Sequence, residues 1–96
     1  MTQTAATVAT TRQYFYNRLA LLRYQQESRF VSAREKIAMT HADLAYRFLN
    51  GESLTDHEKI LLSEKSDYLL TRTDDSVLKK YLTDLVTSLA IKEGIA

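Results

Sequence analysis

Two histidines are the residues of this sequence best suited to proton transfer or metal binding, because the chain has no cysteine. His41 lies two positions before Asp43, and side chains two apart on a helix point in different directions. His57 falls inside a capping-box motif at residues 55–58, which predicts a local role at the surface. Neither histidine belongs to a His-Glu-x-x-His pattern. We therefore expect no metal site and no cofactor.

Acidic and hydroxyl side chains are frequent, but their spacing builds no catalytic group. Asp74 and Asp75 immediately precede Ser76, which is typical of carboxylates that stabilise the positive end of a helix. No serine or threonine lies in a nucleophile elbow. The two glycines, Gly51 and Gly94, form no glycine-rich loop that would hold a phosphate. The sequence predicts a protein that binds a partner rather than an enzyme.

Tyrosines and arginines are interleaved near the N-terminus. This segment contains Tyr14, Tyr16, Tyr24, Arg12, Arg18, Arg23 and Arg29. Such a pattern suits contacts with nucleic acid or a membrane surface. It also suits tyrosines at the rim of a bundle, with arginine stems covering apolar surface. Arg12, Tyr16 and Arg23 are the candidate partner-binding residues here.

The charge is small overall and unevenly distributed. Net charge is +1, with seven basic and three acidic residues in 1–50 and six basic and nine acidic in 51–96. Attraction between the two halves explains the asymmetry, and a basic partner-binding face is the alternative. The chain is far less basic than dedicated DNA-binding domains, so a nucleic-acid partner is not favoured.

Hydrophobic spacing and helix boundaries divide the chain into four predicted helices. The first spans about Thr11 to Ser28. The second begins at Ser32 and ends at Asn50-Gly51, and the third begins at Thr55. The fourth begins at residues 73–76 and ends at Gly94. Its apolar stripe is the most regular of the four and comprises Leu78, Leu82, Leu85 and Leu89.

Short connections make consecutive helices antiparallel neighbours. The sequence therefore predicts an all-α fold, an antiparallel four-helix bundle with short loops, formed by a single domain of residues 1–96. We expect residues 1–10 to be flexible. Neither a signal peptide nor an apolar run of about 20 residues is present, so we expect a small soluble protein of the cytoplasm.

The second half of the chain resembles a known family. Residues 54–65 combine an acidic helix start with paired leucines, and residues 74–92 combine an acidic turn with Val77-Leu78-Lys79-Lys80-Tyr81-Leu82 and a later Leu89-Ala90. These segments resemble the immunity proteins of pediocin-like (class IIa) bacteriocins. The resemblance covers less than half of the chain and does not extend to the tyrosine- and arginine-rich segment.

The resemblance implies an antiparallel four-helix bundle that protects a bacteriocin-producing cell. Such a protein engages the bacteriocin's receptor, a mannose phosphotransferase membrane component, from the cytoplasmic side. Binding there would allow the protein to contact the membrane surface peripherally. It implies recognition by exposed residues of the C-terminal half, here Lys79, Lys80, Lys92 and Glu93. The alternative is a small phage- or plasmid-encoded protein that inhibits or regulates a host protein or nucleic-acid complex. The sequence leaves the partner, the host and the oligomeric state open.

Overall fold

The protein is an all-α, four-helix bundle. The computed structural model describes residues 5–27 and 32–92, and these contain no strand. Helix α1 spans Ala5–Glu27, α2 spans Ala33–Leu49, α3 spans Asp56–Arg72 and α4 spans Ser76–Lys92. The predicted fold class is confirmed.

Helix α1 begins at Ala5, whereas the sequence predicted a start near Thr11 and flexibility before it. Two threonine hydroxyls in this extra segment donate to backbone carbonyls one turn earlier, Thr10 to Ala6 and Thr11 to Thr7, each at 2.9 Å. Val8 packs against the core, and Thr11 is fully buried. The helix-forming alanines of residues 5–10 and the packing of Val8 and Thr11 together extend the helix beyond its predicted start. Residues 1–4 and the predicted end at Ser28 lie outside the described residues.

The turn between α2 and α3 is built from local backbone bonds and one glycine. The N–H of Asn50 donates to Tyr46 O, the N–H of Gly51 to Phe48 O, and the N–H of Glu52 to Arg47 O. Gly51 has φ of 87°, a backbone conformation that glycine adopts without a steric penalty. The predicted end of the second helix at Asn50-Gly51 is confirmed.

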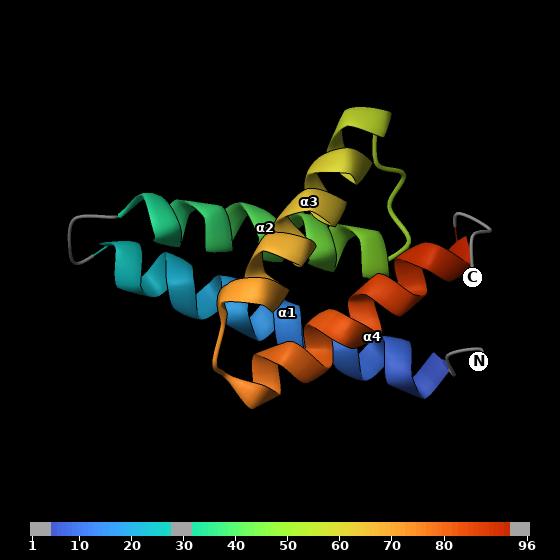
Figure 1. The fold of residues 1–96 in the computed structure, drawn as a ribbon, viewed down its shortest axis with the longest axis horizontal. Helices are drawn as coiled ribbons and strands as arrows, with labels where there is room; N and C mark the ends of the chain where they lie inside the picture. The colour runs from blue at the N-terminus through green and yellow to red at the C-terminus, as the bar shows by residue number, and fades with distance from the viewer. Residues whose placement is uncertain (1–4, 28–31, 93–96) are drawn as a thin grey trace.

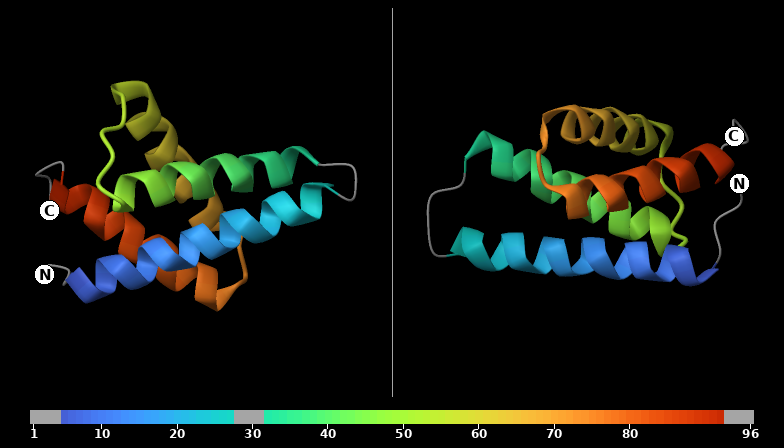
Figure 2. Two further views of the ribbon diagram at one scale, coloured as in Figure 1. Left: turned by 180° about the vertical axis from the view of Figure 1, so that it is seen from behind. Right: turned by 60° about the horizontal axis from the view of Figure 1, so that its bottom comes forward.

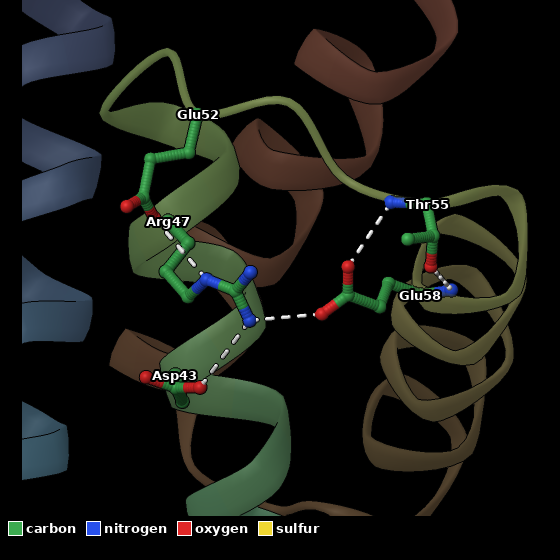
Figure 3. Close-up of polar contacts among 5 residues, drawn as sticks. All are labelled: Asp43, Arg47, Glu52, Thr55 and Glu58. Atoms are coloured by element: carbon green, nitrogen blue, oxygen red, sulfur yellow. Dashed lines mark hydrogen bonds and ion pairs between the residues drawn. The ribbon is translucent and has the colours of Figure 1, made fainter.

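A capping box at the start of α3 is tied to the end of α2 (Figure 3). The Glu58 N–H donates to Thr55 Oγ1 at 3.1 Å, and the Thr55 N–H donates to Glu58 Oε1 at 3.0 Å. The other Glu58 oxygen accepts from Arg47 Nη1 at 2.9 Å. Arg47 also contacts Glu52 at 3.2 Å and Asp43 at 3.8 Å. The Thr55 backbone and Arg47 hold the pKa of Glu58 below its usual value.

The other predicted helix starts are also observed. The Glu35 N–H donates to Ser32 Oγ at 3.2 Å at the start of α2. Asp75 Oδ1 accepts from the N–H of Val77 at 2.9 Å and of Leu78 at 3.2 Å, so it caps α4. Gly94, the predicted end of the fourth helix, lies outside the described residues.

The helices pack around one core. The predicted leucine stripe of α4 is buried, with Leu82 and Leu85 fully enclosed. Phe15 of α1 and Leu62 of α3 are also fully enclosed. Figures 1 and 2 show α1 and α2 as an antiparallel pair, with α3 crossing α2 and α4 returning beside α1. The bundle therefore combines one long hairpin with a second, shorter hairpin laid across it.

One polar pair lies inside this core. His41 of α2 and Ser66 of α3 are both fully buried, and His41 Nε2 lies 2.9 Å from Ser66 Oγ. The Phe15 ring packs edge-on against the imidazole, with the ring centroids 5.4 Å apart. His41 Nδ1 has no hydrogen-bond partner among the described residues. Burial, together with the smaller effects of the Arg18 and Lys65 charges, lowers the pKa of His41 to about 4.

We expect Leu85→Ala to lower the free energy of unfolding by about 2–5 kcal/mol, because it removes a fully buried side chain and leaves a cavity. Urea denaturation followed by circular dichroism measures this change. Val77→Ala on the same helix is the matched control, because Val77 is 54% exposed and its truncation should cost less than about 0.5 kcal/mol. Equal effects of the two substitutions would contradict the assigned core.

We expect acid to destabilise the fold through His41. Its pKa is about 4 in the folded chain against 6.5 in the unfolded chain, so the unfolded state binds more protons between these values. The stabilisation is fully present above pH 6.5 and is lost as the pH falls toward 4, by about 3 kcal/mol in total. Denaturation curves across this range measure the slope.

His41→Gln should flatten that pH dependence, and His57→Gln is the matched control because it makes the same exchange at an exposed position. Carboxylates contribute equally to both variants, so the comparison isolates the imidazole. The same slope in both variants would show that His41 does not carry the effect.

Candidate functional site

The outer face of α1 is the candidate binding site. Tyr16 is 49% exposed and Tyr24 is 72% exposed, and Arg23 is exposed beside them. These three residues line a shallow depression of about 270 Å³ together with Leu19 and Ala20. The depression has an apolar floor, aromatic walls and one fixed positive charge, which suits insertion of a partner's side chain.

Helical spacing produces this surface. Tyr16, Ala20 and Tyr24 follow at intervals of four residues and therefore form one row along α1. The small side chain of Ala20 between the two tyrosines leaves the hollow. The neighbouring row, Phe15 and Leu19, is buried and fixes how the helix is rotated against the bundle. The Tyr16 ring also rests against Tyr46 of α2, with centroids 5.2 Å apart.

Arg12 shares this face in part. It precedes Tyr16 by one helical turn and is half-buried. Tyr16 and Arg23 both line the depression, whereas Arg12 does not. The structure therefore brings two of the three residues predicted on the first helix into one pocket and places the third beside it.

The lysines predicted on the fourth helix lie on a different surface. Lys79 and Lys80 are exposed in the first turn of α4. The Lys80 ammonium lies 4.8 Å from the centroid of the Tyr81 ring. Tyr81 in turn stacks on Tyr14 of α1, with centroids 4.2 Å apart. Burial raises the pKa of the Tyr14 hydroxyl, and the Arg18 charge partly opposes that rise.

Tyr14 and Tyr16 are two residues apart, so they point to different sides of α1. Neither Lys79 nor Lys80 lines the depression around Tyr16. Lys92 is the last residue of α4, and Glu93 lies outside the described residues. The residues predicted from sequence thus form at least two separate surfaces.

Two features of the structure escaped prediction from sequence. The first is the buried contact between His41 and Ser66, although the place of His41 one turn after Ile37 in an apolar stripe was a usable signal. The second is a cleft lined by Arg18, Arg34 and Arg72, which come from three different helices. No sequence spacing connects these arginines.

The described part of the chain comprises residues 5–27 and 32–92. This part of the chain holds no group of three or more acidic or histidine side chains arranged to bind a metal ion. None of its helices combines the length and apolar character that crossing a bilayer requires.

Comparison with known proteins identifies no relative of this chain. No protein-family model, curated protein or solved structure matches the chain.

Proposed function

We propose that this protein works by binding a protein partner through the outer face of α1, and that it serves as an immunity protein against a pediocin-like bacteriocin. The observation that carries the binding proposal is the exposed row of Tyr16 and Tyr24 with Arg23 around one depression. Tyrosine and arginine dominate the energetically important positions of protein interfaces. Exposed aromatic side chains of this size also favour burial against a partner.

A protein partner fits this face better than nucleic acid does. Among the described residues, Arg23 is the only basic one that lines the depression, and the net charge of the chain is only +1. Nucleic-acid binding draws its affinity from many phosphate contacts, each needing a cation. A face with two tyrosines and one arginine instead matches the apolar centre and polar rim of a protein interface.

The immunity role rests on the sequence resemblance in residues 54–92. In this proposal, the bacteriocin's receptor, a mannose phosphotransferase membrane component, is the partner, and it is engaged from the cytoplasmic side. Lys79 and Lys80 are exposed at the start of α4 and remain available to select the bacteriocin. The α1 face then supplies affinity and the α4 surface supplies specificity.

The first test is expression of the full chain in a bacteriocin-sensitive lactic acid bacterium, scored as survival against a panel of pediocin-like peptides. We expect protection against one or a few of them. Protection against none of the panel would reject the immunity role.

Substitutions test which face acts. Tyr16→Ala combined with Tyr24→Ala should abolish protection and lower the free energy of unfolding by only about 1 kcal/mol, because Tyr24 is 72% exposed and Tyr16 loses mainly its contact with Tyr46. Ile60→Ala is the matched control, since Ile60 of α3 is 56% exposed and lies outside the depression. Full protection by the tyrosine double variant would show that α1 is not the binding face.

Binding and immunity can fail separately. If the chain protects cells against none of the peptides, affinity capture from host lysate at low and high salt tests the remaining alternative, a phage- or plasmid-encoded inhibitor. Capture of a protein by the wild type and by Ile60→Ala, but not by the double variant, would retain the binding face and discard the immunity role. Capture lost steeply with rising salt would instead indicate nucleic acid.

A further inference from the structure

A second hollow of the molecule lies where the end of α3 and the start of α4 meet α1 and α2. It has a volume of about 370 Å³, at the lower end of the range for small-molecule sites. Arg18 of α1, Arg34 of α2 and Arg72 of α3 line it. Three cations from three helices are thereby gathered around one cleft.

None of these arginines is neutralised by the described part of the protein. Within residues 5–27 and 32–92, no carboxylate lies within ion-pair distance of Arg18, Arg34 or Arg72. Arg47 shows the contrast, because three carboxylates surround it. The cleft therefore holds positive charge that no ion pair within the described residues balances.

Arg18 gives the strongest indication of a ligand. Its Nε atom is buried and has no hydrogen-bond partner among the described residues. A buried donor without a partner is costly, and a donor on a charged group more so. The guanidinium of Arg72 is held in place instead, 4.2 Å above the centroid of the Tyr68 ring, which also lines the cleft. An anion in the cleft would pair with both.

Two carboxylates line the same cleft and do not cancel its charge. Glu35 Oε1 accepts from Ser32 Oγ at 3.2 Å and is thereby engaged at the start of α2. Asp74 is exposed just before α4. Among the described residues that line the cleft, three arginines against two carboxylates leave an excess of positive charge.

Apart from Tyr68 and Thr73, the remaining described residues that line the cleft are apolar. Leu22, Ala38, Leu69 and Leu78 come from all four helices. Free inorganic ions gain nothing from such a surface, whereas a ligand with an apolar or aromatic part buries it. The cleft thus combines an anion-binding edge with an apolar floor.

We propose that this cleft binds a small amphipathic anion, a carboxylate or a phosphate monoester attached to an apolar or aromatic group. The anionic group pairs with Arg18, Arg34 and Arg72, whose planar guanidinium groups match either oxyanion in a bidentate manner. The apolar part lies on the leucines and beside Tyr68. This site is separate from the outer face of α1 and does not depend on the proposed immunity role.

The test is titration of the full chain with phenyl phosphate, benzoate, inorganic phosphate and phenol. Calorimetry measures the affinity of each compound, and amide NMR shifts locate where it binds. We expect saturable binding of phenyl phosphate or benzoate, with shifts near Arg18, Arg34 and Arg72. Inorganic phosphate should bind more weakly, and phenol should not compete. The stronger of the two aromatic ligands identifies the anionic group as phosphate or carboxylate. Absence of saturable binding by both would overturn the proposal.

Arg72→Gln and Arg34→Gln should each weaken the binding about tenfold, because each removes a charge-assisted contact. Both residues are exposed, so the variants should fold, whereas Arg18→Gln tests the buried donor directly once circular dichroism shows a native helix content. Arg23→Gln is the matched control, since Arg23 lies on α1 outside the cleft. Equal weakening by Arg23→Gln would reduce the effect to net charge and reject the site.

Discussion

The buried contact between His41 and Ser66 is the constraint on which the arrangement of the helices depends. Polar atoms inside a core must be paired, so α3 is fixed against α2 at the one position where Nε2 and Oγ meet at 2.9 Å. Leucine side chains alone would tolerate several such positions. Phe15 packs against the same imidazole and brings α1 into the arrangement. One polar pair thereby specifies how three helices meet.

Arginines serve two different purposes in this bundle. Arg47 is surrounded by carboxylates and joins the end of α2 to the capping box of α3, which sets where the second hairpin departs from the first. Hydrogen bonding to Glu58 raises the pKa of Arg47, so the group keeps its charge. Arg18, Arg34 and Arg72 line a cleft and form no ion pair with a carboxylate of the described residues. Ion pairs with carboxylates therefore distinguish Arg47, which stabilises the fold, from the arginines that remain available to a ligand.

Helix α1 carries both the core and the proposed binding surface. Phe15 and Leu19 are buried on one row, while Tyr16 and Tyr24 on the adjacent row remain exposed. Rotation of α1 about its axis is fixed by the buried row, so the tyrosines are presented in a defined orientation without a loop or a lid. A partner binding there meets a preorganised surface, which lowers the entropic cost of association.

Short-range sequence patterns were sufficient to predict much of the secondary structure of this protein. The four helices, the capping residues Ser32, Thr55 and Asp75, the turn at Gly51 and the leucine stripe of α4 follow from short-range spacing. The position of Tyr16 and Arg23 on one face of α1 also follows from the sequence, because residues seven apart lie on the same side of a helix. The start of α1 at Ala5 was not predicted, since burial of Thr11 and packing of Val8 extend the helix.

Three features required the tertiary structure. They are the separation of the α4 lysines from the tyrosine face, the contact of His41 with Ser66, and the convergence of Arg18, Arg34 and Arg72. Each depends on residues far apart in the chain, and their meeting is decided by how the helices cross.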